Sequence, residues 1–172
     1  TLLINGLPLV QIELKRRGVD IKEAVNQIMR YRKHSYQGLY HFIQLFVVSN
    51  GVDTKYFANS DKDILYSHTF FWTDDNNIRA TNLKDFSVVF LARDLLVKML
   101  TKFTILNDTD KVLMVMRPYQ VYATEALIRQ ATLTNRNAYI WHTTGAGKTL
   151  TSFKTAQILA SMPSIKKVIF LV

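Results

Sequence analysis

The feature that most constrains this chain is a glycine-rich run at Thr143–Thr149, which reads TTGAGKT. It fits the pattern G-x-G-K-[S/T], although His142 stands where the full Walker A pattern has its first glycine. Glycines let consecutive backbone N–H groups turn towards phosphate oxygens, and the N-terminus of a following helix adds partial positive charge. The run therefore predicts a nucleotide site, and a plain glycine-rich turn before a helix is the alternative.

The segments around this run have the order expected of a phosphate loop. Apolar spacing predicts a strand over 138–142, a helix over 147–161 and a second strand over 166–172, which implies a parallel pair joined by a crossover helix. The predicted ligands of ATP and Mg²⁺ are Thr144, Gly145, Ala146, Gly147, Lys148 and Thr149. Among them, Lys148 would reach the β- and γ-phosphates and the Thr149 hydroxyl would bind Mg²⁺.

Composition narrows the class of partner. The 172 residues contain 22 Lys and Arg against 13 Asp and Glu, a net charge of +9, which suits a polyanionic partner, nucleic acid first; a surface kept basic for solubility explains the composition equally well. Cysteine is absent, so disulfides and thiolate metal sites are excluded, and we expect a cytoplasmic protein. No apolar run reaches the length of a membrane-spanning helix, so no membrane partner is expected.

The N-terminal part predicts a hairpin followed by a helix. Residues 1–4 and 7–15 are strand-like and are joined by Asn5-Gly6, a favourable pair for a tight turn. Asp20 then marks the start of a helix that extends to about His34. Further on, we expect β-structure over 39–49 and 55–58, and helices over 85–103 and 119–132.

The second strand of this hairpin carries polar side chains on one face. Gln11, Glu13 and Lys15 alternate with apolar residues and therefore share that face. The strand is either an ordinary edge strand with its polar face in water or a nuclease strand of the PD-(D/E)xK type. In such nucleases two acids on adjacent strands hold Mg²⁺, and a lysine two residues beyond the second acid orients the attacking water. Glu13 would be that second acid and metal ligand, and Lys15 the lysine.

Two further residues support the nuclease interpretation. Gln27 and Tyr31 lie four residues apart on the predicted helix, hence on one face, and resemble the QxxxY element of one branch of these nucleases. A half-buried polar pair at a helix–sheet seam is the alternative. The first metal-binding acid is missing, because no Asp or Glu precedes Glu13, and we expect it just before Thr1.

A glutamine upstream of the phosphate loop adds to the nucleotide site. Arg117-Pro118-Tyr119-Gln120 lies one helix and one turn before the predicted strand at 138–142. Superfamily 2 helicases and translocases carry a glutamine there that hydrogen-bonds the adenine edge. By that similarity Gln120 is the predicted adenine reader, and a solvent-facing helix-start glutamine is the alternative.

Together these stretches resemble the R (motor and restriction) subunit of type I restriction–modification enzymes, over nearly the whole chain. The segments that carry the resemblance are INGLPLVQIELKRRG, NQIMRY, FIQLFVVSNGVDTKYF, FFWTDDNNI, RPYQ and YIWHTTGAGKTLTSF. The resemblance implies an ATP-dependent type I endonuclease and translocase that acts on unmethylated double-stranded DNA. It further implies methyltransferase (M) and specificity (S) subunits as partners.

We therefore expect an α/β chain that is a piece of something longer. Residues 1–105 would be part of a PD-(D/E)xK nuclease-like domain, and residues 106–172 the start of a RecA-like P-loop domain. The family's Asp-Glu motif and arginine finger come from later segments, so we expect this piece alone to hydrolyse no ATP and cut no DNA. The rival hypotheses are a superfamily 2 repair or remodelling translocase with a non-catalytic DNA-binding N-terminus, and an interaction module with a degenerate phosphate loop.

The remaining charged and aromatic residues carry weaker signals. The basic runs 15–17 and 30–33 fit contact with a DNA backbone, although solvated faces explain such runs as well. His34, His41 and His68 lack metal-ligand spacing. Phe70-Phe71-Trp72 fits a hydrophobic core better than a base-stacking platform.

Overall fold

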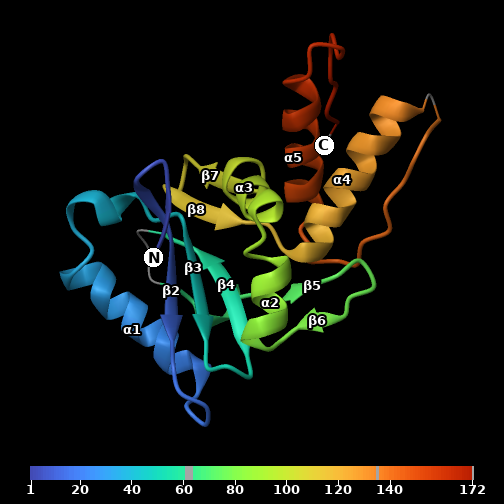
Figure 1. The fold of residues 1–172 in the computed structure, drawn as a ribbon. Coiled ribbons are helices and arrows are strands. Elements are labelled where there is room, and N and C mark those ends of the chain that lie inside the picture. The colour runs from blue at the N-terminus through green and yellow to red at the C-terminus, as the bar shows by residue number, and fades with distance from the viewer. Residues whose placement is uncertain (61–63, 135, 172) are drawn as a thin grey trace. The chain divides into compact units, whose positions relative to one another are not determined.

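The computed structural model describes residues 1–60, 64–134 and 136–171. The chain forms two compact units, Thr1–Met116 and Arg117–Val172, and combines helices with sheets, as the α/β prediction requires (Figure 1). The boundary expected between residues 105 and 106 falls inside a strand, β7 (Thr104–Asn107), which pairs with β8 (Val112–Val115). The first unit therefore keeps both strands of this hairpin.

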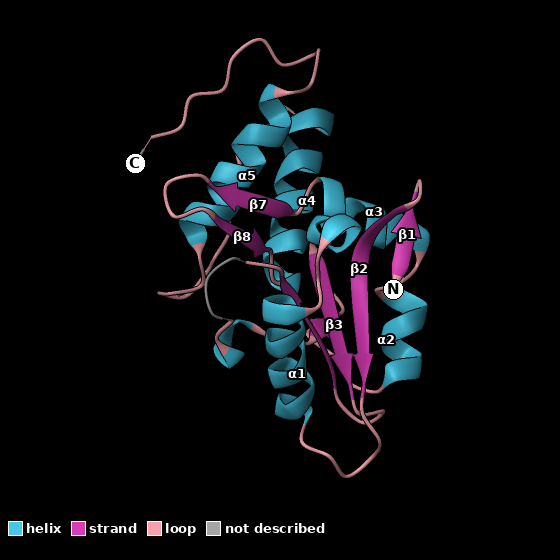
Figure 2. Ribbon diagram, turned by 90° about the vertical axis from the view of Figure 1, so that its left-hand side faces the viewer, coloured by secondary structure: helices cyan, strands magenta, loops and turns pink. Residues whose placement is uncertain are grey.

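A four-stranded sheet forms the centre of the first unit. Its strands, in the order β1-β2-β3-β4, are Leu2–Ile4, Leu7–Leu14, Leu45–Ser49 and Thr54–Ala58. The β1–β2 and β3–β4 pairs are antiparallel. By contrast, β2 and β3 are parallel, and their arrows run the same way in Figure 2. Asn5 and Gly6 both have positive φ, 51° and 82°, as a tight two-residue turn requires, so the predicted hairpin is confirmed.

Helix α1 (Ile21–His34) connects the two parallel strands. Its N-terminus is capped by the Asp20 side chain, which accepts a hydrogen bond from the Lys22 N–H at 2.9 Å. Four residues of one helix face are buried against the sheet: Ile21, Ala24, Val25 and Ile28. They pack with Phe46, Val48 and Phe57 of β3 and β4, and the predicted helix is confirmed.

Shorter elements complete the first unit. They are the 3₁₀ turns Gly38–Phe42 and Tyr66–His68, the strands β5 (Trp72–Thr73) and β6 (Arg79–Ala80), and the helices α2 (Leu83–Val89) and α3 (Arg93–Thr101). Two expectations need correction here. Only the second half of 39–49 is a strand, and the single helix expected over 85–103 is two helices, because Ala92 adopts an extended conformation with ψ 136°.

An aromatic cluster fills the core on the opposite side of the sheet from α1. Tyr56, Trp72 and Phe90 are all buried, with ring centroids 4.5 Å apart for Tyr56–Phe90 and 5.2 Å apart for Trp72–Phe90. The Tyr56 hydroxyl donates to the Met116 carbonyl oxygen at 2.8 Å. The expectation that Trp72 belongs to the core is confirmed.

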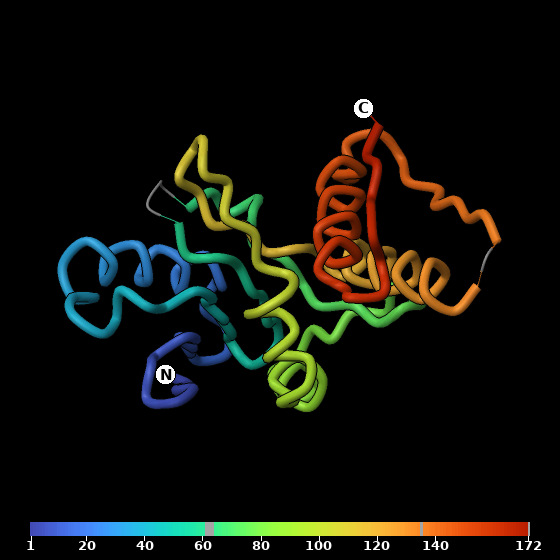
Figure 3. The backbone as a smooth tube through the Cα atoms, turned by 90° about the horizontal axis from the view of Figure 1, so that it is seen from above, coloured from blue at the N-terminus to red at the C-terminus, as the bar shows by residue number. Residues whose placement is uncertain are grey.

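The second unit consists of helices α4 (Pro118–Leu133) and α5 (Lys148–Ala160), which pack against each other (Figure 3). The helix predictions are confirmed to within two residues at each end. The strands expected over 138–142 and 166–172 do not form within the described residues, where Figure 2 draws the C-terminal segment as loop. A strand is held by hydrogen bonds to neighbours, and these segments pair with none in the described part of the chain, which leaves Trp141 and Leu171 88% exposed.

No helix in the described ranges is long and apolar enough to cross a membrane.

Candidate functional site

The sheet register places Glu13 on the face that α1 covers. In the parallel pair Glu13 lies beside Val48, and Val48 is buried against α1. Neighbouring residues in register point to the same side of a sheet, so Glu13 and Lys15 face the helix and not the opposite, aromatic side. This arrangement brings the end of β2 next to the helix residues Gln27 and Tyr31.

The four predicted nuclease residues form one connected chain of hydrogen bonds. The Lys15 Nζ lies 3.3 Å from the Glu13 Oε1, and it also donates to the Gln27 Oε1. The Gln27 Nε2 in turn donates to the Tyr31 hydroxyl. Strand alternation and the four-residue helical spacing therefore bring together the residues that the sequence singled out.

The centre of this chain is shielded but open to solvent. The side chain of Glu13 is 14% exposed and that of Lys15 is 21% exposed, whereas Tyr31 lies at the outer end. At this partial burial the ion pair keeps its two charges close without removing them fully from water. A phosphate oxygen or a water molecule can therefore reach both groups.

The structure adds Tyr36, which the sequence did not single out. The chain reverses after α1, where the N–H groups of Ser35 and Tyr36 both donate to the Tyr31 carbonyl oxygen, at 2.7 and 2.9 Å. Burial, and then the nearby Glu13 carboxylate, raise the pKa of Tyr36 to about 12. No spacing signal could have found this tyrosine, because it follows the helix and reaches the site only through the chain reversal.

In the second unit, backbone geometry shapes the phosphate loop. Gly145 and Gly147 have φ of 74° and 76°, left-handed conformations that glycine adopts without steric cost. Gly147 is also the N-cap of α5, so the loop ends where the helix N–H groups are unpaired. The Lys148 Nζ donates to the Thr143 carbonyl oxygen at 3.3 Å, and both Lys148 and Thr149 are exposed.

Gln120 lies directly against this loop. Its amide accepts from the Arg117 N–H at 2.9 Å and donates to the Ala146 carbonyl oxygen at 3.0 Å. The side chain is 4% exposed, and a Cβ built on Gly147 would lie 2.4 Å from its Nε2. The expected solvent-facing alternative is therefore wrong for Gln120. The Tyr119 hydroxyl, which the sequence did not single out, also donates to the Ala146 carbonyl oxygen, at 2.9 Å.

No group of three or more His, Asp or Glu side chains that could hold a metal ion occurs among the described residues. The two predicted metal ligands, Glu13 and Thr149, lie in different units and would each supply oxygen to a separate ion. Both are hard oxygen donors of the kind that Mg²⁺ prefers, and Mg²⁺ commonly takes its other ligands from waters and substrate phosphates. Each residue thus fits a magnesium ion that is completed by other ligands.

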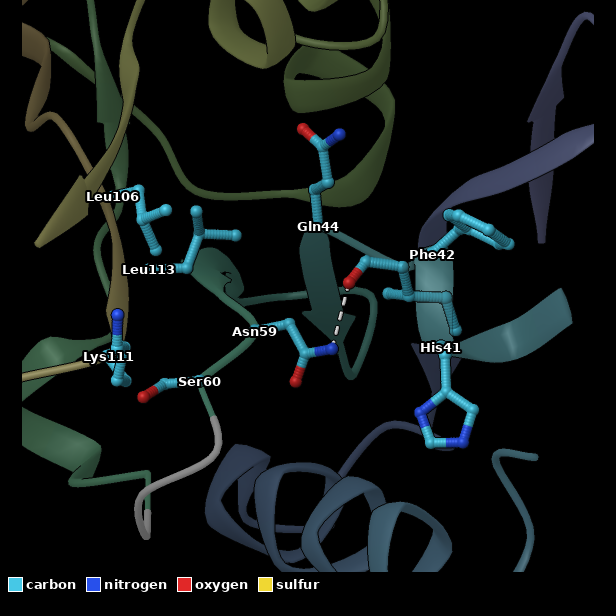
Figure 4. A pocket seen from close by; sticks show the side chains of 9 residues that line it. His41, Phe42, Gln44, Asn59, Ser60, Leu106, Lys111 and Leu113 are labelled. Carbon is cyan, nitrogen blue, oxygen red and sulfur yellow. Dashed lines mark hydrogen bonds between the residues drawn. The ribbon is translucent and has the colours of Figure 1, made fainter. Parts of the chain in front are cut away.

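A pocket of about 300 Å³ also lies in the first unit, between the segments that precede β3 and follow β4 and the β7–β8 hairpin (Figure 4). Across it the Asn59 Nδ2 donates to the Ile43 carbonyl oxygen at 2.8 Å. His41 and Lys111 are also in its lining, and none of the lining side chains is a carboxylate. The pocket is therefore distinct in character from the carboxylate-containing site around Glu13.

Two family models match parts of the chain. Residues 1–63 match "Type I restriction enzyme R protein N terminus", and residues 113–172 match "Type III restriction enzyme, res subunit". The first match contains the Glu13–Tyr31 site, and the second contains the phosphate loop.

Whole-protein comparisons agree with these matches. The chain is 60% identical over all 172 residues to the type I restriction enzyme SauCOLORF180P endonuclease subunit of Staphylococcus aureus (strain COL), and covers 18% of it. It is 61% identical over 172 residues to the SsaAORF53P endonuclease subunit of Staphylococcus saprophyticus, again covering 18% of it. Identity to the EcoprrI endonuclease subunit of Escherichia coli is 47% over 133 residues, which are 74% of this chain and 42% of that subunit.

Both kinds of match are to restriction-enzyme chains. More particularly, the chain is similar over its whole length to endonuclease subunits of type I restriction enzymes. It spans about a fifth of the length of its staphylococcal relatives, 18% in each case.

Proposed function

We propose that the protein to which this chain belongs is the restriction and motor subunit of a type I restriction–modification enzyme. It would cut unmethylated double-stranded DNA in the cytoplasm after ATP-driven translocation, in complex with methyltransferase and specificity subunits. The observation that carries this proposal is the hydrogen-bonded chain from Glu13 to Tyr31, within a segment that matches an R-protein family model.

The first unit would supply the nuclease, as part of a PD-(D/E)xK domain. Glu13 would be one ligand of Mg²⁺, which lowers the pKa of its bound water and stabilises negative charge on the phosphate. Lys15, fixed between Glu13 and Gln27, would orient the water that attacks phosphorus. Gln27 would hold the lysine amine in place, and Tyr31 would hold the Gln27 amide. The first metal-binding acid would come from another part of the longer protein, because β1 and β3, the two neighbours of β2, contain no Asp or Glu.

The second unit would begin a RecA-like motor domain that binds ATP. The N–H groups of Thr144–Thr149 would surround the phosphates, with Lys148 at the β- and γ-phosphates. Thr149 would bind Mg²⁺ through its hydroxyl. The Gln120 amide makes two hydrogen bonds to the backbone and can make more. Gln120 would use this remaining hydrogen-bonding capacity in the adenine site. Segments 138–142 and 166–171 would pair with strands from other parts of the longer protein.

The basic residues near the nuclease site would contact the DNA backbone. Arg16 and Arg17 follow Lys15 directly and are exposed, as is Arg30 on α1. Each phosphate that such residues neutralise adds to the salt dependence of binding. The loss of one arginine should therefore weaken binding to all DNA sequences alike.

The test uses the full-length subunit, reconstituted with its methyltransferase and specificity partners on unmethylated plasmid. Three variants are compared with wild type for ATP-dependent cleavage and DNA-stimulated ATP hydrolysis: Glu13→Ala, Lys148→Ala and, as a matched control, Glu23→Ala. Glu23 is an exposed acid on α1 whose carboxylate accepts no hydrogen bond from the described residues. We expect Glu13→Ala to abolish cutting and keep ATP hydrolysis, and Lys148→Ala to lose both.

The outcomes separate the candidate functions. If Glu13→Ala cuts like wild type, the opening strand is an ordinary polar-faced strand and the nuclease assignment fails. If Lys148→Ala still hydrolyses ATP, the motor assignment fails instead. Loss of cutting in Glu23→Ala would show that the assay responds to general damage in the first unit.

A further inference from the structure

A tyrosine outside the predicted motif lies beside the proposed nuclease site. The ring of Tyr36 stacks on Phe46 of β3, with centroids 6.1 Å apart, and on Tyr40, with centroids 5.8 Å apart. Its edge meets the ring of Tyr31 at 6.0 Å. Packing on both faces and a backbone bond to Tyr31 therefore fix the position of the ring.

The hydroxyl of this ring is buried and has no hydrogen-bond partner among the described residues. Such groups are uncommon in folded proteins, since most buried polar atoms are paired. Burial and the Glu13 carboxylate hold the pKa of Tyr36 near 12, so the hydroxyl stays protonated and remains a donor at working pH. A donor of this kind beside the proposed nuclease site can serve an acceptor within that site.

The Glu13 carboxylate has one oxygen that is available to accept a hydrogen bond. Its Oε1 faces the Lys15 Nζ, whereas its Oε2 accepts no hydrogen bond from the residues that the structure describes. After burial, the negative charge of Glu13 is the main cause of the raised pKa of Tyr36. Phe46, on which Tyr36 stacks, lies beside Gln11 in register, and Gln11 and Glu13 share one face of β2, so the Tyr36 ring and the Glu13 carboxylate lie on the same side of the sheet.

We propose that Tyr36 is a positioning residue, whose hydroxyl donates to the Glu13 carboxylate and orients it when it binds a divalent cation. The proposal rests on the nuclease function proposed for Glu13. Carboxylates that bind metal ions are usually hydrogen-bonded themselves, and the loss of such a partner typically costs about 10–100-fold in metal affinity or activity. Tyr36 thus extends the site beyond the two residues of the QxxxY-like element.

The test compares Tyr36→Phe with Tyr40→Phe in the full-length subunit. Tyr40 is the matched control because its ring stacks on Tyr36, yet it is 44% exposed. Mn²⁺ binding is titrated by electron paramagnetic resonance without nucleotide or DNA, and the binding that Glu13→Ala removes is taken as the Glu13-dependent part. Cleavage by the reconstituted enzyme is then measured against Mg²⁺ concentration.

We expect Tyr36→Phe to weaken the Glu13-dependent Mn²⁺ binding by about 10–100-fold. The Mg²⁺ concentration for half-maximal cleavage should rise accordingly, with cleavage restored at saturating Mg²⁺ and DNA-stimulated ATP hydrolysis unchanged. Tyr40→Phe should leave both readouts at wild-type values. Because the hydroxyl makes no hydrogen bond in the described structure, its removal should not lower the melting temperature.

Two results would overturn the inference. One is wild-type Mn²⁺ affinity and Mg²⁺ dependence in Tyr36→Phe; the other is a loss of cleavage at every Mg²⁺ concentration with a lower melting temperature, which indicates a structural role. The failure of the nuclease assignment is recognised separately, because Glu13→Ala would then bind Mn²⁺ and cut DNA like wild type.

Discussion

The contact between Gly147 and Gln120 gives a sharp prediction about the phosphate loop. Gly147 has φ 76° and ψ 40°, a left-handed conformation that costs an L-residue about 1–2 kcal/mol. A Cβ at this position would lie 2.4 Å from the Gln120 Nε2, too close for any real contact. Gly147→Ala must therefore strain the backbone and also displace a buried side chain.

The displacement adds a second cost. Gln120 would lose hydrogen bonds to Arg117 and Ala146, and leaving buried polar groups unpaired costs about 1–3 kcal/mol. With the backbone strain, Gly147→Ala should destabilise the second unit by about 2–5 kcal/mol. Gly145 is the matched control, because it has a similar φ of 74° but open space around a built Cβ, so Gly145→Ala should cost only about 1–2 kcal/mol.

A double-mutant cycle isolates the contact. In a Gln120→Ala background the clash is gone, so Gly147→Ala should cost only the backbone term, which gives a coupling of about 1–3 kcal/mol. The opening free energy of α5 is measured in the full-length subunit by hydrogen exchange of peptides that cover residues 143–155. Equal costs for Gly145→Ala and Gly147→Ala, or no relief in the Gln120→Ala background, would refute the reasoning.

Two further predictions concern the packing of each unit. Tyr56→Phe removes the buried hydrogen bond to the Met116 carbonyl oxygen and should destabilise the first unit by about 1–3 kcal/mol, measured by urea unfolding with tryptophan fluorescence; an unchanged midpoint would contradict it. Burial lowers the pKa of Lys154 below its usual 10.5. Between the lowered pKa and 10.5 the unfolded state therefore binds more protons than the folded state, and the free energy of unfolding should rise with pH over that range. Guanidinium unfolding of wild type and Lys154→Met over that range checks this: the variant should lose the alkaline gain, and an equal gain in both would exclude Lys154 as its source.

Local signals predicted the parts of the fold that depend on local conformation. Asn5-Gly6 favours positive φ at two consecutive residues, and Asp20 supplies a capping oxygen, so the hairpin and α1 follow from a few residues each. The β7–β8 hairpin was not predicted, because its turn lacks such a local signal. Its turn contains Lys111 with φ 54°, a conformation for which lysine gives no sequence signal.

Longer-range pairing could not be predicted so well. The apolar runs over 138–142 and 166–172 have the composition of strands, but a strand forms only where neighbouring backbone groups accept and donate. In the described residues these segments find no such neighbours. Amino-acid composition therefore indicates that a segment can form a strand, but the strand forms only where a neighbouring strand is present to hydrogen-bond with it.

The two candidate sites differ in the structural features that position their functional groups. In the first unit, side chains on regular elements approach one another because strand alternation and helical spacing set their directions, which is why Glu13, Lys15, Gln27 and Tyr31 could be predicted as a group. In the second unit, backbone N–H groups would bind the phosphates under the proposed function, so glycine conformation and the support of Gln120 would matter more than side-chain chemistry. Conservative changes should thus be tolerated differently. Glu13→Gln keeps the shape of its site and loses the charge, whereas Gly147→Ala keeps every charge and loses the shape.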